Sequence, residues 1–561
     1  MFVSPTLHGV SLILIGMGRS CRFTYLFLGI FLGILFFGNL GSYGLLEDNE
    51  ARFFEIAWEM EESGDLVTPK LNFINHFHKP PATFWLVGLS LKCLGATEGA
   101  GRLPVVLAAI ATVILTSLFL PRGEQRVFSV LVLACNLEFW LLSRTVLTDM
   151  FLTLSVTACM LAAYRLIQTE DRRAFWLFWI SLGFSTLVKG PVGPAIIFLA
   201  LLTYHASAER IPWRRWSPLK GLMLFGVVAL PWYLLVCSEY SGLLEYFAGY
   251  QTVERLATTV HGRGGPVWFF LPVVLIGFLP WSLAVPASLR IAFKRSSTLD
   301  RFLLCWLLPS FLLFSLSGSK LPTYILPLFP ALALLVASNW GDREFARRTV
   351  ISTVGVLGLL GLGAFAFSIV GATPELRSAT GVIVLGSLVC LGGAGLTGAL
   401  LRKARVEDAL EASGVTFGIF LIVLSFGLNL TDGAYSSRRL ARAILAHADA
   451  NTVIAEYADH LHGLPYYLDR RLVQVSYPRE TQFERTGSVE GFLYPDLQSF
   501  LAAQGEKPII LVVRRSDYSD ELFSKWEKIY DGRWLVLERR PFSKDQKYSG
   551  VQAKNHEDIS S

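Results

Sequence analysis

A dense group of charged residues and histidines lies between Glu47 and Pro81, directly after an apolar run. This stretch holds eight carboxylates, two His and two Lys. Carboxylates can act as general bases or stabilise a developing positive charge, whereas Lys and His can bind phosphate or a metal ion. A globular core does not tolerate such a contrast, so the pattern predicts polar chemistry at the edge of a membrane.

The rest of the composition predicts a polytopic membrane protein. Of the 561 residues, 53% are hydrophobic and 17% are charged, which is not the composition of a soluble protein. Apolar segments of roughly 15 to 23 residues can cross a bilayer, straight or tilted. We expect about thirteen such segments, at 23–45, 102–120, 126–143, 149–167, 174–188, 191–205, 219–237, 267–289, 302–317, 322–339, 350–370, 379–401 and 414–430.

The basic residues of the short loops predict the orientation in the membrane. If 82–94 lies at the membrane edge instead of crossing it, every basic loop falls on one side. Loops rich in Lys and Arg face the cytoplasm. We therefore expect a cytoplasmic N-terminus and an extracytoplasmic C-terminal region. The basic loops hold Arg19 and Arg22, Arg122 and Arg126, Arg172 and Arg173, Arg210 to Arg215, Arg290 to Arg295, Arg343 to Arg348, and Arg402 to Arg405.

Three regions follow from this pattern. Residues 1–431 are expected to form the membrane domain, with extracytoplasmic juxtamembrane helices within 46–101. Residues 432–543 are expected to form a small soluble α/β domain, because helical and extended patterns alternate there. The polar end, 544–561, is predicted to be disordered. The seven Cys all lie in or beside apolar segments, so no disulfide framework is expected.

Each candidate site residue also has a structural interpretation. The helix expected over Glu50–Glu62 carries a carboxylate stripe and an apolar stripe, as does a helix lying on a membrane surface. Asp48, Asn49 and Glu50 could cap that helix. Asp149 lies five residues after Arg144, so a structural ion pair accounts for it as well as catalysis does.

Seven motifs, taken in order, resemble one protein family. Together they resemble bacterial lipid-linked-sugar glycosyltransferases related to protein O-mannosyltransferases. The resemblance implies a GT-C membrane fold that transfers a sugar from a polyprenyl phosphate on the external face of the cytoplasmic (inner) membrane. The motifs are NEARFFEIAWEMEESGDLVTP from 49, FHKPPATFWL from 77, GRLP from 101, RTVLTDM from 144, LVKGPVG from 187, VERLATTVHGRGGPVWFFLP from 253 and SGSKLPTYILPLFPAL from 317; a tail motif, AEYADHLHGLPYYLDRR from 455, adds to them.

The chain departs from the family pattern at two positions. Asn49 stands where the family usually has an Asp that handles the acceptor, and an amide cannot act as a general base. His78 stands where the family usually has a Glu that shares a metal ion with a later His, here His261. Two imidazoles suit Zn²⁺ better than Mg²⁺ or Ca²⁺, so a divalent metal, zinc first, is a possible cofactor.

The chemistry of the reaction suggests a role for each candidate. Breaking the anomeric C–O bond leaves a polyprenyl phosphate dianion and develops positive charge on the sugar. The leaving phosphate needs cations, for which Lys79, Lys320, Arg255, Arg263 and Tyr324 are the candidates. The sugar and acceptor need polar or anionic groups, for which Asp48, Asn49, Glu50 and Asp149 are the candidates.

The acceptor and even the class of protein have alternatives at this point. A lipid A-like phosphate arrives ionised and needs no base, so Asn49 favours it over a protein or glycan hydroxyl. A lipid transporter or flippase would also have many spans, but its site should lie at mid-membrane on repeated halves, which the sequence does not contain. An inactive scaffold is the third alternative. The expected partners are a polyprenyl-phosphate sugar, an envelope acceptor and membrane lipids, but not nucleic acid.

Overall fold

The chain divides into two compact units. The computed structural model describes residues 21–207, 211–254, 264–370, 374–477, 483, 490–524 and 526–539. Unit 1 takes its described residues from Met1–Ser42, Arg102–Tyr233 and Glu245–Leu430. Unit 2 takes its described residues from Tyr43–Gly101, Leu234–Leu244 and Thr431–Ser561.

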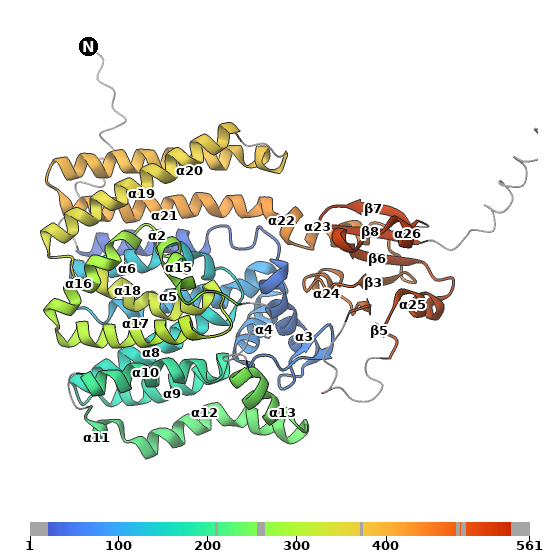
Figure 1. Ribbon diagram of the computed structural model, residues 1–561, viewed down its shortest axis with the longest axis horizontal. Coiled ribbons are helices and arrows are strands. Elements are labelled where there is room, and N and C mark those ends of the chain that lie inside the picture. Colours follow the sequence, from blue (N-terminus) through green and yellow to red (C-terminus); the bar gives the residue numbers. More distant parts are fainter. Residues whose placement is uncertain are drawn as a thin grey trace, which may run out of the picture. The chain divides into compact units, whose positions relative to one another are not determined.

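Unit 1 is built from helices, many of which run side by side (Figure 1). Helices α5, α12, α13 and η6 have residues in the segments of both units. The elements are α2 (Cys21–Phe37), α5 (Glu98–Ser117), α6 (Glu124–Ala134), α7 (Leu137–Leu142), α8 (Thr148–Gln168), α9 (Arg172–Lys189), α10 (Val192–Ser207), α11 (Trp213–Trp216), α12 (Pro218–Glu239), α13 (Leu243–Glu245), η2 (Tyr246–Glu254), η3 (Val267–Phe269), α15 (Phe270–Gly277), η4 (Ser282–Ala284), α16 (Val285–Arg295), α17 (Thr298–Leu316), η5 (Pro322–Leu328), α18 (Phe329–Ala337), α19 (Arg343–Val370), α20 (Pro374–Arg402), α21 (Val406–Gly427) and η6 (Leu428–Thr431).

The helices bear out a multi-pass membrane protein. Among the described residues, seven helices are long and apolar enough to cross a membrane, or up to eight with one bent pair. Four shorter apolar helices accompany them, at Leu26–Phe37, Ala82–Leu94, Val192–Ser207 and Pro322–Ala337. Every apolar segment drawn from the sequence contains helix, but the count of thirteen spans stays a prediction.

Two of the drawn segments are not straight helices. Val267–Gly277 and Ser282–Arg295 meet at an angle of 120°, where 267–289 was expected as one span. Pro280 lies in the break, and a proline removes a helical hydrogen bond and restricts the residue before it. The segment 126–143 divides into α6 and α7, because Asn136 leaves the helical conformation and its side chain accepts from Phe139 N to cap α7.

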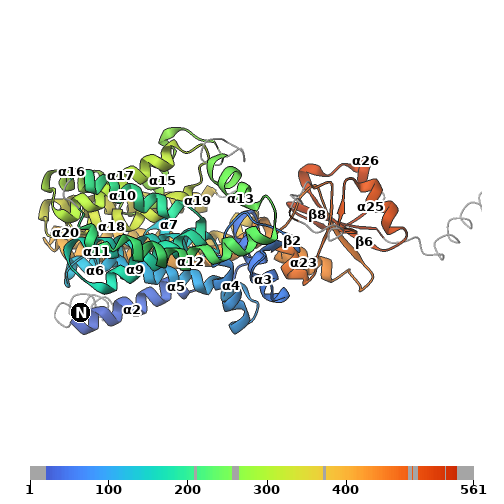
Figure 2. The same ribbon diagram turned by 90° about the horizontal axis from the view of Figure 1, so that it is seen from below.

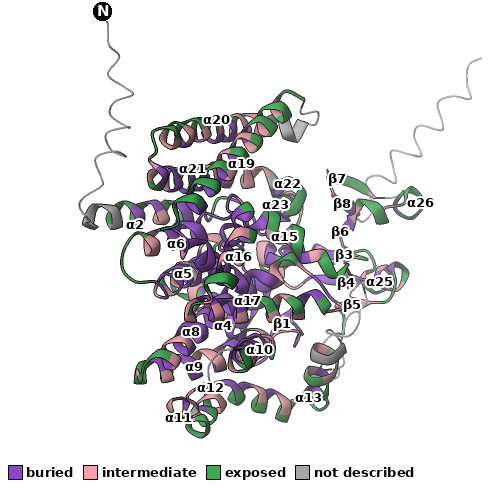
Figure 3. Cartoon of the chain, turned by 60° about the vertical axis from the view of Figure 1, so that its left-hand side comes forward, coloured by how far each residue is buried: buried purple, intermediate pink, exposed green. Residues whose placement is uncertain are grey.

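Large apolar side chains cover the outer faces of several helices in unit 1. Figure 3 shows much of α12, α19 and α20 as exposed or half-buried. Met223 is 65% exposed, Leu359 74% and Leu388 60%. Apolar side chains at such density are stable in contact with lipid tails, which is the contact that a spanning helix makes.

The first segments of unit 2 form two packed helices joined by a small hairpin. These elements are η1 (Glu47–Ala51), α3 (Arg52–Ser63), β1 (Lys70–Leu71), β2 (Ile74–Asn75) and α4 (Ala82–Leu94). The turn residues Asn72 and Phe73 both have positive φ, as a tight hairpin requires. Helix α4 has 13 residues, fewer than the roughly 20 that a straight span needs.

The tail of unit 2 is a small α/β domain, as the sequence predicted. Its sheet has the order β5-β4-β3-β6-β8-β7. Strands β5, β4, β3 and β6 are parallel, and β8 pairs antiparallel with both β6 and β7. Figure 2 shows β6 and β8 of this sheet together with α25 and α26 of the same domain. The elements are α22 (Asp432–Tyr435), α23 (Arg438–Leu445), β3 (Val453–Tyr457), α24 (Leu464–Leu468), β4 (Val473–Val475), β5 (Leu493–Tyr494), α25 (Leu497–Gln504), β6 (Ile509–Arg514), η7 (Arg515–Asp517), α26 (Asp520–Phe523), β7 (Glu527–Asp531) and β8 (Trp534–Arg539).

Strands β3, β6 and β8 form the centre of this domain. Their side chains alternate between two buried clusters, one on each face of the sheet. Both faces are covered, so the near-continuous apolar sequence of β6 is that of a buried strand. The hairpin also joins this domain, because Asn72 exchanges two hydrogen bonds of 2.9 Å with the backbone of Leu472.

Candidate active site

A buried ion pair joins the ends of two neighbouring helices in unit 1. Asp149 lies in the first turn of α8, and Lys189 is the last residue of α9. A short connection makes these helices antiparallel, so the start of α8 lies beside the end of α9. Lys189 Nζ donates to Asp149 Oδ1 at 2.6 Å, and both side chains are almost wholly buried. Each charge also has the favourable sign for its helix end.

Tyr324 completes this group. The short helix η5 packs against α8, and Lys189 Nζ lies 4.7 Å from the centre of the Tyr324 ring. A cation over an aromatic face is held electrostatically, and more strongly where water is excluded. Asp149, Lys189 and Tyr324 come from three separate motifs, and the structure places them in one cluster. This cluster offers one negative charge, one positive charge and a phenol.

Lys320 is buried at the turn that precedes η5. Its ammonium donates to Ser317 O at 2.6 Å, and its side chain passes close to Gly265. A Cβ at Gly265 would lie 3.3 Å from Lys320 Cδ, so a larger residue there would press on the lysine stem. A cation fixed in this way is preorganised for an anionic ligand.

The residues predicted to act on sugar and acceptor in unit 2 differ in exposure. Glu50 is fully buried, and its Oε2 accepts from Leu46 N at 3.1 Å, which supports the turn of η1. Asn49 is exposed. The side chain of Asp48 lies outside what the structure describes. The three residues share one turn of helix, but Glu50 faces the interior and Asn49 faces outward.

The helix that follows, α3, is not an exposed amphipathic helix. Glu55 and Glu59 of α3 are fully buried, contrary to the expected solvated stripe. Glu55 Oε1 accepts from Asn72 N and Glu59 Oε2 from Phe73 N, each at 2.9 Å. The hairpin turn exposes these two N–H groups, and the carboxylates satisfy them. The acidic stripe therefore holds the hairpin against α3.

The remaining predicted residues are only partly described. His78 and Lys79 are half-buried, and the His78 ring centre lies 3.9 Å from that of His76. Arg255, His261 and Arg263 lie outside the described residues. The proposed His78–His261 metal pair and the two arginine contacts to phosphate therefore stay predictions.

Comparison with known proteins identifies the class of enzyme. A sequence profile of the dolichyl-phosphate-mannose-protein mannosyltransferase family matches residues 78–234. The undecaprenyl phosphate-alpha-4-amino-4-deoxy-L-arabinose arabinosyl transferase of Pectobacterium carotovorum is 27% identical over 91% of this chain and 94% of its own. A Proteus mirabilis transferase of the same name is 26% identical over 86% of this chain and 89% of its own.

A crystal structure has the same fold. ArnT from Cupriavidus metallidurans, solved bound to undecaprenyl phosphate, superposes with a TM-score of 0.81 at 23% identity and covers 93% of this chain and 98% of its own. This chain shares that fold, and its sequence is similar to the undecaprenyl-phosphate-dependent arabinosyl transferases over nearly its whole length. The fold and the enzyme class expected from the motifs, a polyprenyl-phosphate-sugar-dependent glycosyltransferase, are thereby confirmed.

Lys189 of this glycosyltransferase was not predicted as a site residue from the sequence. The motif LVKGPVG contains it. The signal was a cation at the end of an apolar helix followed by Gly190, which takes the positive φ that ends α9. The sequence could not supply the partner, because Asp149 is 40 residues away along the chain.

Glu138 is a second residue that the sequence did not single out. It lies in α7, and its two carboxylate oxygens are buried with no hydrogen-bond partner among the described residues. A Cβ at Gly277 would lie 2.2 Å from Glu138 Oε2, so the break after α15 approaches this carboxylate closely. An ionisable group inside a membrane domain usually has a function or a nearby cation.

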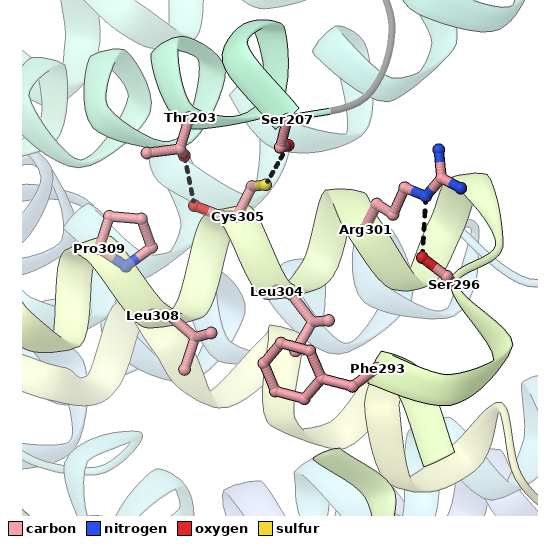
Figure 4. A pocket seen from close by; sticks show the side chains of 9 residues that line it. All are labelled: Thr203, Ser207, Phe293, Ser296, Arg301, Leu304, Cys305, Leu308 and Pro309. Carbon is pink, nitrogen blue, oxygen red and sulfur yellow. Dashed lines mark hydrogen bonds between the residues drawn. The ribbon is translucent and has the colours of Figure 1, made fainter. Parts of the chain in front are cut away.

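The pocket in Figure 4 is not part of this cluster. Its lining comes from the C-terminal end of α10, the end of α16 with Ser296 just after it, and α17 as far as Pro309. Lys189 precedes the other end of α10, about 20 Å away along a helix of this length. Figure 4 shows mostly apolar lining, with Arg301 bonded to Ser296 Oγ at 3.0 Å. None of the predicted site residues lines it.

Proposed function

We propose that the enzyme transfers 4-amino-4-deoxy-L-arabinose from an undecaprenyl-phosphate donor to a phosphate of a lipid A-like acceptor. The observation that carries this proposal is the cluster of Asp149, Lys189 and Tyr324 in a chain that aligns with aminoarabinose transferases over nearly its full length. The name of those relatives supplies the donor and the sugar.

The cluster suits the charges of the reaction. An oxygen of the acceptor forms a bond to the anomeric carbon as the bond to the donor phosphate breaks, and the electron pair leaves with the phosphate. Lys320 and Lys189 would stabilise the leaving dianion, with Tyr324 as a neutral donor. Asp149 would stabilise the positive charge on the sugar. The carboxylate and the cations would act in a site from which water is excluded. Lys79, Arg255 and Arg263 stay predicted phosphate ligands.

Asn49 supports a phosphate acceptor. Its amide cannot remove a proton, and an ionised phosphate has none to remove. The matching profile is named for a protein mannosyltransferase. Transfer to a protein hydroxyl would need a base at this point. We therefore place the protein with the enzymes that glycosylate lipid phosphate.

We further propose that the N-terminus is cytoplasmic and that the tail is extracytoplasmic, in the inner membrane. The asymmetry of Lys and Arg between alternate loops supports this orientation. Reporters fused after Ser207, Asp300 and Ser561 test it. The first two fusions should be active only with a cytosolic reporter, and the last only with an external one; the reverse pattern would refute the orientation.

Mass spectrometry of lipid A tests the function in cells. Expression in a host that makes the donor but lacks its own transferase should add aminoarabinose to lipid A phosphates. Expression of the Asp149→Asn variant at the same level should not. Modification of protein instead of lipid A would refute the proposed acceptor.

A further inference from the structure

Three side chains of metal-ligand type converge within unit 2. Glu55 comes from α3, and His460 and His462 come from the loop between β3 and α24. One ligand atom from each lies within 4.8 Å of the other two, and no other such group occurs among the described residues. Glu55 and His460 have fully buried side chains, and that of His462 is 16% exposed.

Hydrogen bonds orient two of the three groups. His460 Nδ1 lies 2.6 Å from Glu456 Oε2, and because a carboxylate only accepts, the ring donates from Nδ1. The other nitrogen, Nε2, then carries the lone pair of the neutral ring. Glu55 Oε1 accepts from Asn72 N, so its second oxygen, Oε2, is directed toward the histidines. A histidine held by a carboxylate in this way is the usual arrangement around a bound metal.

Both histidines face the same carboxylate oxygen. His460 Nε2 lies 3.6 Å from Glu55 Oε2, and His462 Nδ1 lies 3.6 Å from the same oxygen. A divalent cation between these three atoms would accept a lone pair from each imidazole and one from the carboxylate. Zinc bonds of ~2.0–2.2 Å in a tetrahedron put neighbouring ligand atoms about 3.3–3.6 Å apart, which matches these two distances.

We propose that Glu55, His460 and His462 bind a divalent transition metal, zinc in the first place. Two imidazoles and one carboxylate form a ligand set that zinc takes, whereas Mg²⁺ and Ca²⁺ prefer oxygen atoms. The site is separate from the metal pair predicted at His78 and His261. It joins α3 to a loop near the other end of the chain.

The position in the sheet supports a ligand site. The loop with His460 and His462 follows the carboxyl end of β3, and β3 pairs with β4 on one side and β6 on the other. The chain runs from β3 to β4 and β5, then returns to β6 at the far side of β3. Ligands of parallel sheets bind outside the carboxyl ends of strands where the order reverses in this way.

Packing around the group adds a consequence. Tyr466 of α24 lies against Phe54 and Trp58 of α3, with ring centres 4.7 Å and 6.0 Å apart. A metal beside this aromatic contact would fix α3 to the tail domain without a disulfide. Because the metal would bind the folded protein and not the unfolded chain, it would raise the unfolding temperature of the protein.

Metal titration of the purified full-length protein in detergent tests this site. The chelator-treated protein is titrated with Co²⁺, whose visible bands report imidazole and carboxylate coordination, and zinc content is measured separately by mass spectrometry. We expect wild type to bind Co²⁺ at this site, and His462→Ala to bind one equivalent fewer or at least tenfold more weakly. His447→Ala, an exposed histidine of the same domain, is the matched control and should behave as wild type.

A further variant distinguishes this site from the metal pair predicted at His78 and His261. The Co²⁺ signal that is lost in His462→Ala should remain in His78→Ala, because the His78 substitution affects only the predicted pair of His78 and His261. If His462→Ala did not fold, the shift of the wild-type unfolding midpoint by Zn²⁺ would decide in its place. Wild type that binds no Co²⁺ and whose midpoint does not respond to Zn²⁺ would overturn the proposal and leave His460 as an imidazolium between Glu55 and Glu456. Unchanged Co²⁺ binding in folded His462→Ala would also overturn it.

Discussion

The carboxylate of Asp149 and the ammonium of Lys189 lie 2.6 Å apart, Oδ1 to Nζ, where the start of α8 meets the end of α9. A buried ion pair is costly to desolvate, and removal of one partner leaves the other charge uncompensated. Such a pair at the end of two membrane helices is better accounted for by a need for both charges in a reaction than by stability. Its members are therefore the first residues to change.

Asp149→Asn should lower kcat/KM for sugar transfer at least a hundredfold, because in the proposed mechanism the carboxylate of Asp149 stabilises the positive charge on the sugar. Lys189→Met should lower kcat/KM by a similar factor, because the leaving phosphate would lose a cation. The loss of kcat/KM in the double variant should be much smaller than the product of the two single losses, since each single change already disrupts the pair. Asp408→Asn, in the surface pair with Arg405, is the control and should leave kcat/KM unchanged. Full activity of Asp149→Asn would remove Asp149 from the site.

Lys320→Met keeps most of the side-chain stem and removes the charge, so kcat should fall far more than the amount of folded protein. We expect the same for Lys79→Met, on the prediction that it binds the donor phosphate. Rates measured with purified protein at saturating donor give kcat directly. Lys92→Met, whose side chain is 70% exposed, serves as the control. Wild-type kcat in both Lys320→Met and Lys79→Met would refute their assignment to the phosphate.

Asn49→Asp distinguishes the two kinds of acceptor. For a phosphate acceptor, the new negative charge should leave transfer unchanged or reduce it. For a hydroxyl acceptor, a restored base could raise the rate by roughly a hundredfold. Asn49 is exposed, so the change should not affect folding. We expect no gain, and the exposed Asn451→Asp as a control should behave as wild type; a large gain would contradict the phosphate assignment.

Glu47 predicts a pH dependence of stability. Burial raises the pKa of Glu47 to about 7, although N–H groups of Ser437 and Gly463 donate to it and lower it. Because the pKa of Glu47 is higher in the folded protein than in the unfolded chain, this residue contributes stability at low pH. The contribution is complete below the ordinary pKa of 4.5 and is lost as the pH rises through about 7. Glu47→Ala leaves two buried N–H groups without an acceptor, at a cost on the order of 2–4 kcal/mol.

The unfolding midpoints of wild type and Glu47→Ala at pH 5 and pH 8 test this prediction. The unfolding midpoint of wild type should be higher than that of Glu47→Ala at both pH values. The difference should be larger at pH 5 than at pH 8. Glu62→Ala, an exposed residue of α3, is the control and should show no such difference. If the difference in unfolding midpoint were larger at pH 8 than at pH 5, the hydrogen bonds would lower the pKa of Glu47 by more than burial raises it.

Local pattern was enough to predict most helices and strands. Helix α8 runs from Thr148 to Gln168 where 149–167 was drawn, because an apolar run has only one stable form in a membrane. Strands β3, β6 and β8 also lie where the sequence predicts strands, at 452–457, 508–513 and 533–538. The break after Gly277 was missed, because Pro280 alone does not distinguish a kink from a turn.

Contacts between distant segments were beyond the sequence. The pairing of Asp149 with Lys189 depends on the register of two helices, and that of Glu55 with His460 on the docking of a hairpin onto a sheet. The acidic stripe of α3 shows the limit most plainly. Its spacing predicted a solvated face, but the positive-φ turn at Asn72 and Phe73 supplied buried N–H donors instead.

Transfer in a purified system tests the proposed function most directly. Wild type and Asp149→Asn are reconstituted with undecaprenyl-phosphate-linked 4-amino-4-deoxy-L-arabinose, labelled in the sugar, and with lipid A. We predict label on a lipid A phosphate with wild type, and at least a hundredfold less with Asp149→Asn at equal folded protein. No transfer by folded wild type, or label on an acceptor hydroxyl, would contradict the proposed function.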